Sequence, residues 1–160
     1  MRPVSQGKLY RKKINRENKK MNKNKQLEII KQNIETEPYA RYLGIKVLEL
    51  SEGHSIVSME VRKEYDNIFG ITHGGAVFSL LDVAFGSAAN SYGTIAVAIN
   101  INVSYIKPSL NGNVLTAEAN EVTRSNRISN FSIIVKNEKG EILAVSQAVA
   151  YLKKDKLPFL

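Results

Sequence analysis

The stretch that decides the fold reads Asn67-Ile-Phe-Gly-Ile-Thr-His73-Gly74-Gly75-Ala-Val-Phe-Ser-Leu-Leu-Asp82-Val-Ala-Phe-Gly-Ser-Ala-Ala-Asn90. From Gly74 onward it is rich in Ala, Leu, Phe and Val, and it is long enough for about four helical turns. Apolar residues occupy nearly every face of this predicted helix. Such a helix must be surrounded by other structure, because it has no polar face to present to water.

Strand-like segments lie on both sides of this helix in the sequence. Two short runs precede it and four longer ones follow, at residues 45–50, 55–61, 94–106, 113–122, 128–136 and 141–152. The short turns between them make neighbouring strands antiparallel. The order predicts an α+β fold in which an antiparallel sheet wraps around one long central helix. A short amphipathic helix is also expected from Lys25 to Asn33, bounded by Pro38.

The positive charge is concentrated near the N-terminus. The whole chain of 160 residues carries +8, and residues 1–33 hold eleven Lys or Arg against two Glu, or +9, which leaves 8 − 9 = −1 for residues 34–160. We expect a basic, flexible arm over 1–33 that runs into the short helix, one domain over 34–152, and a tail over 153–160. A nearly neutral domain predicts no nucleic-acid partner, while a solubilising role and a tethering role both stay open for the arm.

Two further expectations follow from composition. No apolar run approaches the roughly 20 residues of a membrane span and no secretory signal is recognisable, so we expect a cytoplasmic protein without a membrane span. The chain has no cysteine and only two histidines, His54 and His73, which predicts neither disulfides nor a metal site. No cofactor is expected.

Asp82 is the most informative single residue, because it lies between Leu81 and Val83 in the apolar helix. Burying a carboxylate without partners costs several kcal/mol or forces it to take up a proton. Its presence therefore indicates either a cleft with a catalytic acid or base, or an Asp that points into solvent or caps a neighbouring element. The helix pattern alone leaves both interpretations open.

Gly74 and Gly75 stand where the helix begins, so a ligand oxygen can reach the unpaired N–H groups of its first turn. Glycine allows close approach, and such N–H groups can stabilise an oxyanion; a simple tight turn is the alternative. The eight residues from Gly74 to Asp82 span roughly 12 Å of helix. If Asp82 activates a water that attacks a carbonyl held at Gly74, the two groups must come from two chains, as in a two-fold homodimer.

The quoted stretch resembles the signature of hotdog-fold thioesterases of the phenylacetate-pathway (PaaI-like) group, because it joins Asn67, the His73-Gly74-Gly75 triplet and Asp82 at that family's separations. Residues 35–152 follow the family's order of elements. The resemblance implies hydrolysis of an acyl-CoA without a metal, CoA being part of the substrate, by homodimers that often pair into homotetramers.

The resemblance also implies roles for single residues. Asp82 is expected to act as general base or nucleophile, and Gly74 to supply the oxyanion-hole amide. Asn67 is expected to orient the water or substrate, and His73 to help position the thioester, with Gly75 beside it. Asn100 occupies a place where relatives often have Ser or Thr, so its role is a weaker expectation.

Recognition of the CoA phosphates needs positive charge, which the turn Arg124-Ser125-Asn126-Arg127 offers, with Lys107 as a second candidate. Ordinary solvated charge is the alternative for all of them. Two other functions stay open at this point: an acyl-CoA-binding or sensing protein without catalysis, and a structural dimer with an inactive site. A hotdog dehydratase is disfavoured, because its catalytic His and carboxylate are placed differently.

Overall fold

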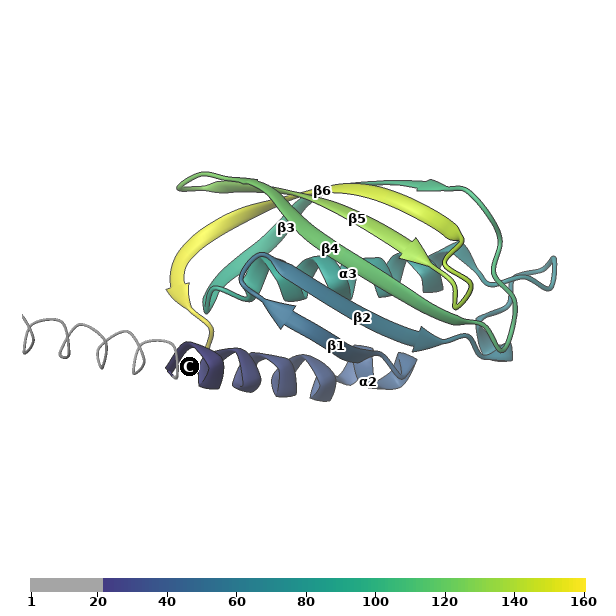
Figure 1. The fold of residues 1–160 in the computed structure, drawn as a ribbon, viewed down its shortest axis with the longest axis horizontal. Helices are drawn as coiled ribbons and strands as arrows, with labels where there is room; N and C mark the ends of the chain where they lie inside the picture. Colours follow the sequence, from purple (N-terminus) through teal and green to yellow (C-terminus); the bar gives the residue numbers. More distant parts are fainter. Residues whose placement is uncertain (1–21) are drawn as a thin grey trace, which may run out of the picture.

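The computed structural model describes residues 22–160 and shows a curved sheet wrapped around one central helix (Figure 1). That helix, α3, runs from Gly74 to Asn90, the bounds predicted from composition. The six strands form one sheet in the order β1-β2-β4-β5-β6-β3, and every neighbouring pair is antiparallel. Their bounds are β1 Lys46–Ser51, β2 His54–Glu60, β3 Thr94–Tyr105, β4 Val114–Arg124, β5 Ile128–Lys136 and β6 Ile142–Lys156. The predicted α+β hotdog architecture is confirmed.

The core forms between α3 and the concave face of the sheet. Leu80, Leu81 and Ala84 of α3 are fully buried, as the apolar composition of the helix requires. Phe85 of α3 meets Phe131 of β5 edge to face, with 5.2 Å between ring centroids and 75° between ring planes. This packing holds α3 at a fixed position against the middle of the sheet.

The N-terminal region is more helical than predicted. Residues 22–36 are helical, which extends the expected helix at both ends. Glu37 separates this helix from a second one, α2 (Pro38–Leu43), and Pro38 occupies the first turn of α2, where a missing N–H costs nothing. Gly44, with a φ of 70°, ends α2. Both helices lie along the side of the molecule away from most of the sheet (Figure 1).

The sequence predictions for the last strand and for the N-terminal arm have different outcomes. Strand β6 continues to Lys156, past the expected end at residue 152, because its last part pairs with the start of β3, where Thr94 lies opposite Lys156. The predicted flexible arm falls mostly on residues 1–21, which lie outside the described residues, so it stays a prediction. Within residues 22–160, no helix combines the length and hydropathy that crossing a bilayer requires.

Strand β3 is an edge strand that pairs only with β6. It is 12 residues long and carries apolar side chains at the surface, including Val97, Ile99 and Tyr105. Long apolar edge strands are usually covered by another chain, because their free N–H and C=O groups otherwise invite uncontrolled pairing. The β3 edge therefore has both free backbone groups and exposed apolar side chains.

A matched pair of Leu→Ala substitutions tests the location of the core. Leu115 of β4 is fully buried, whereas Leu48 of β1 is 51% exposed. We expect Leu115→Ala to lower the free energy of unfolding by about 2–5 kcal/mol, because it leaves a cavity, and Leu48→Ala to change it by about 0.5 kcal/mol or less. Urea unfolding followed by circular dichroism measures both, and equal losses would contradict this description of the core.

Candidate active site

The first turn of α3 is capped by the residue that precedes it. The Nδ1 atom of His73 accepts a hydrogen bond of 2.8 Å from the Gly75 N–H, so Nδ1 is unprotonated and the ring proton sits on Nε2. The His73 carbonyl accepts from the N–H groups of Ala76 and Val77, at 2.9 and 3.4 Å. His73 thus satisfies three of the first four N–H groups of the helix.

The fourth of these groups, the Gly74 N–H, finds no hydrogen-bond acceptor within residues 22–160. It lies at the positive end of the α3 dipole, where an anionic oxygen is stabilised. The ring of Tyr105 passes so close that a Cβ on Gly74 would lie 3.3 Å from it, and the Tyr105 hydroxyl donates to the Gly74 carbonyl at 3.0 Å. Glycine suits this position because the Tyr105 ring would have to shift to admit a side chain, and the Gly74 N–H is left available for a ligand.

Asn67 organises the loop before α3. Its side-chain Oδ1 accepts from the Phe69 N–H at 2.8 Å and its carbonyl accepts from the Gly70 N–H at 3.0 Å, which closes a tight turn with Gly70 at a φ of 70°. Asn67 and Gly74 line one cavity of about 330 Å³, together with Tyr105 and Lys107. We call it the Gly74 cavity. The structure therefore brings together three of the predicted residues, Asn67, Gly74 and Lys107.

The Gly74 cavity also contains two buried hydroxyl groups without partners. Thr72 and Ser109 are 6% and 3% exposed, and their oxygens have no hydrogen-bond partner among the described residues. Buried polar groups are rarely left unpaired in a complete assembly. Both hydroxyl oxygens are closed off from solvent, so a molecule in the cavity could reach them only after a local rearrangement.

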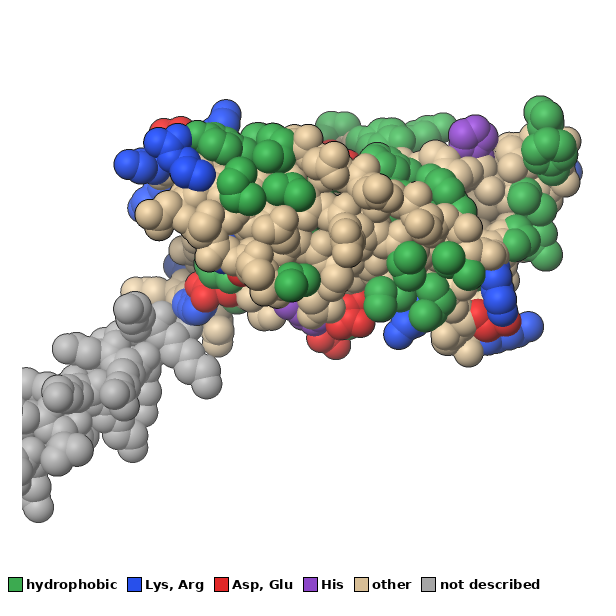
Figure 2. Space-filling model, turned by 90° about the horizontal axis from the view of Figure 1, so that it is seen from above, with side chains coloured by type: hydrophobic (Ala, Val, Ile, Leu, Met, Phe, Trp, Pro, Cys, Tyr) green, Lys and Arg blue, Asp and Glu red, His purple; other side chains and the backbone are tan. Residues whose placement is uncertain are grey.

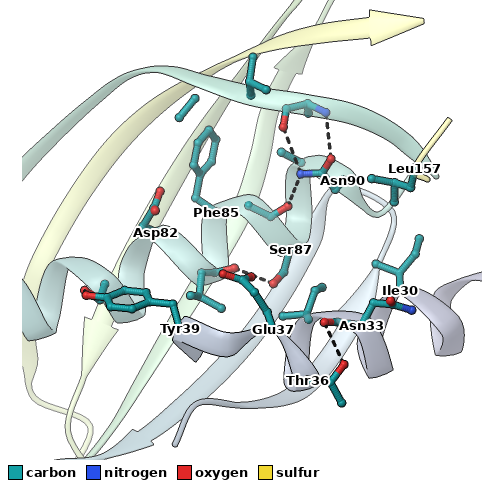
Figure 3. A pocket seen from close by; sticks show the side chains of 18 of the residues that line it. Ile30, Asn33, Thr36, Glu37, Tyr39, Asp82, Phe85, Ser87, Asn90 and Leu157 are labelled. Atoms are coloured by element: carbon teal, nitrogen blue, oxygen red, sulfur yellow. Dashed lines mark hydrogen bonds between the residues drawn. The ribbon is translucent and has the colours of Figure 1, made fainter. Parts of the chain in front are cut away.

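Asp82 lies in a different cavity of about 840 Å³ between α3, the start of β3 and the N-terminal helices. We call it the Asp82 cavity (Figure 3). Asp82 is still exposed in the single chain, yet the walls around it are largely apolar and remove part of its hydration. This desolvation raises the pKa of the Asp82 carboxyl above its ordinary value. A carboxylate with a raised pKa at the mouth of a cavity has the properties of a general base.

The remaining predicted residues lie away from both cavities or are engaged within the chain. Asn100 is exposed on the edge strand β3 and lines neither cavity. The Gly75 N–H donates to Nδ1 of His73 and is not free for a substrate. The Ser125 hydroxyl donates to the Ile128 carbonyl and holds the β4–β5 turn closed. Substrate contacts by these three residues stay predictions.

The basic residues predicted to bind CoA are partly neutralised. Arg124 stacks 3.8 Å above the ring of Tyr92 and bonds Glu121 at 2.9 Å, and Lys107 pairs with Glu141 at 2.9 Å. Arg127 donates to the hydroxyl of Tyr151 but has no acidic partner among the described residues. Figure 2 shows Lys and Arg side chains gathered at the end of the sheet where the β4–β5 turn lies.

Sequence reasoning missed the walls of the Asp82 cavity that come from the N-terminal helices. Tyr39 of α2 shares a hydrogen bond of 2.9 Å with Ser79 of α3, and Glu37 lines the same cavity. Tyr105, which covers Gly74, was also missed. The amphipathic pattern of residues 27–34 was a signal that this helix packs on something, but it did not say on what.

Comparisons with known proteins identify the family. A putative esterase of Archaeoglobus fulgidus is 37% identical over 116 residues, which cover 72% of this chain and 75% of that protein. The acyl-coenzyme A thioesterase PaaI of Escherichia coli is 32% identical over 111 residues, 69% of this chain and 79% of that protein. A model of the thioesterase superfamily matches residues 69–144. The chain belongs to the thioesterase superfamily.

Solved structures agree with this assignment. The TT0310 protein of Thermus thermophilus has a TM-score of 0.69 at 35% identity, over 72% of this chain and 97% of that one. The PaaI protein of E. coli has a TM-score of 0.77 at 28% identity, over 81% of this chain and 96% of that one. The predicted resemblance to PaaI-like hotdog thioesterases is confirmed, and so is the enzyme class.

The raised pKa of Asp82 predicts how the stability of this thioesterase depends on pH. In the unfolded chain an Asp ionises near about 3.9, whereas in the folded chain Asp82 ionises at a higher pH. The folded state therefore loses stability as the pH rises through this window. Asp82→Asn removes the titration, so its stability relative to the wild type should increase across the window and stay constant above it.

Urea unfolding from pH 3.5 to pH 8 measures this difference. Asp155→Asn, at an exposed position of β6, is the control and should give no such increase. A stability difference that shrinks with rising pH would contradict a raised pKa at Asp82.

Proposed function

We propose that the protein hydrolyses an acyl-CoA thioester to free CoA and a carboxylic acid, at sites shared between two protomers. As water attacks the thioester carbonyl carbon, Asp82 takes its proton, and the carbonyl oxygen becomes an anion held by the Gly74 N–H. The tetrahedral intermediate then expels the CoA thiolate, which is protonated as it leaves. In an alternative mechanism, the Asp82 carboxylate itself attacks the carbonyl carbon and expels the CoA thiolate. Water then hydrolyses the resulting acyl-enzyme, so the same two residues are used.

The observation that carries this proposal is the combination of an unpaired Gly74 N–H and a desolvated Asp82 on one rigid helix. Eight residues separate them, or roughly 12 Å along α3, and they open into different cavities. A single chain cannot place both groups on one carbonyl. A homodimer in which Asp82 of one protomer faces Gly74 of the other gives two equal sites.

The surface of the chain supports such a dimer. The edge of β3 has free backbone groups and apolar side chains, and the loop before α3 exposes Ile68 and Phe69 at 92% and 77%. Figure 2 shows apolar side chains gathered at the end of the molecule where this loop projects. Apolar exposure on this scale marks a surface that another chain covers. A homotetramer made of two such dimers, and a cytoplasmic location, belong to the same proposal.

The CoA moiety is proposed to bind through its phosphates to Arg127 and, with their acidic partners displaced or shared, to Arg124 and Lys107. Arg127 is favoured, because it has no acidic partner in the described part of the chain. The mechanism itself needs no cofactor or metal: the base is a carboxylate and the oxyanion is held by a peptide N–H.

A non-catalytic acyl-CoA-binding protein is the alternative function. The raised pKa of Asp82 favours catalysis, because a binding protein gains nothing from a desolvated carboxylate.

Replacing the base separates these functions. Asp82→Ala should lower kcat by about 100-fold or more while CoA binding persists, because general-base catalysis contributes about 10²–10⁴ in rate. Release of free thiol from acyl-CoA measures turnover, and EDTA should leave the wild-type rate unchanged. Asp155→Ala, outside both cavities, is the control. Normal turnover by Asp82→Ala would refute the assignment of the base.

Mixing two inactive variants tests whether each site is shared. Asp82→Ala and Asn67→Ala should each be inactive alone. After unfolding and refolding together in equal amounts, about half of the dimers are mixed and each of these has one intact site, so about a quarter of the wild-type activity should return. If no activity returns although mixed dimers form, each site lies within one chain.

A further inference from the structure

The far wall of the Asp82 cavity is built by parts of the chain that lie outside the match to the thioesterase superfamily at residues 69–144. The α3 side of the cavity falls within the match, whereas the opposite side comes from the N-terminal helices and the C-terminal tail. These wall residues are Ile30, Asn33, Ile34, Thr36, Glu37, Tyr39, Leu157 and Phe159. These wall residues lie on other segments of the chain than Asp82 and Gly74, so the shape and charge of the wall can be changed without replacing either residue.

Glu37 is the charged residue of this wall. It occupies the N-cap position of α2, but its side chain makes no capping hydrogen bond. It forms no ion pair within residues 22–160. Figure 3 shows the Glu37 side chain directed from the start of α2 toward α3, on the side where Asp82 lies. No Lys, Arg or His of the described chain lines the cavity, so its two carboxylates are not compensated by a cation there.

Nearly all the hydrogen-bond donors on the neutral polar side chains of the cavity already donate to other groups of the protein. Ser79 donates its hydroxyl proton to the Gly75 carbonyl, so Tyr39 must donate its own to Ser79. Ser87 donates to the Val83 carbonyl at 2.6 Å. The remaining donors are used likewise: Thr36 to the Gln32 carbonyl, Asn90 to the Gly86 and Ala96 carbonyls, and one N–H of Asn33 to the Ile29 carbonyl.

We propose that Glu37 is a specificity-determining residue that makes the Asp82 cavity accept neutral acyl groups and reject acyl groups that end in a carboxylate. This inference rests on the proposed function, because it assumes that the acyl group enters the Asp82 cavity. A carboxylate-ended acyl group would lose its hydration there, would find almost no side-chain donor, and would be repelled by Glu37. A neutral acyl group of the same length meets none of these penalties.

Two acyl-CoA substrates of similar size test the proposal. Glutaryl-CoA ends in a carboxylate, and hexanoyl-CoA ends in an uncharged methyl group at a similar distance from the thioester. The wild type should hydrolyse hexanoyl-CoA with the higher kcat/KM, and added salt should narrow the difference by screening the repulsion. Glu37→Gln keeps the shape of the side chain and removes its charge. It should raise kcat/KM for glutaryl-CoA by about tenfold and change that for hexanoyl-CoA by about twofold or less.

Glu49→Gln is the matched control, because Glu49 is exposed like Glu37 but lies on β1 and lines neither cavity. Glu37→Lys should go further and favour glutaryl-CoA. An unchanged substrate ratio in Glu37→Gln, or an equal change in Glu49→Gln, would overturn the role of Glu37 while leaving the thioesterase proposal intact.

A wild type that hydrolyses neither substrate would instead remove the proposed function. Calorimetry can then measure the affinity of the wild type and of Glu37→Gln for both acyl-CoAs. These affinities test whether Glu37 repels a carboxylate-ended acyl group without relying on turnover. The proposal requires that glutaryl-CoA binds more weakly to the wild type and gains affinity in the variant, and equal affinities would refute it.

Discussion

The arrangement depends on one constraint: α3 is a single uninterrupted helix held inside the sheet. Its fully buried Leu80, Leu81 and Ala84 fix both its position and its rotation, so Asp82 must face the N-terminal helices. The same rigidity fixes the first turn, where His73 satisfies three N–H groups and leaves that of Gly74 unpaired. The positions of Asp82 and Gly74, the proposed base and oxyanion donor, are thus set by packing, and neither can move toward the other within one chain.

Most of the fold could be predicted because its signals are local. The bounds of α3 and of β5 agree with the prediction, since composition marks the helix and the turns at residues 124–127 and 137–140 mark the strand. The place of β3 at the sheet edge could not be predicted. It depends on pairing with β6, in which Thr94 lies opposite Lys156, 62 positions later in the chain, and no local pattern records such a contact.

Site residues could be predicted where the residue type is unusual for its position in the sequence. Asp82 stands out in an apolar helix, and Gly74 stands out at a helix start. The cavity walls gave no such signal, because they arise from contacts such as Tyr39 with Ser79, which are 40 residues apart. The basic turn shows the opposite problem. Arg124 has the right charge for a phosphate, but its stacking on Tyr92 and its bond to Glu121 appear only in three dimensions.

With Asp82 as the proposed base and the acyl group in the Asp82 cavity, base strength and substrate choice are linked. Desolvation by the cavity wall raises the pKa of Asp82, which makes its carboxylate a stronger base. The same desolvation makes it unfavourable to bring a further charge into the cavity. A carboxylate-ended acyl group would add a second negative charge near Asp82 and raise its pKa further, so that less of the base is ionised at neutral pH. Such a group would therefore be penalised twice, in binding and in proton abstraction. A neutral acyl group also deepens the desolvation of Asp82, but it adds no like charge beside the carboxylate, so the electrostatic part of both penalties is absent.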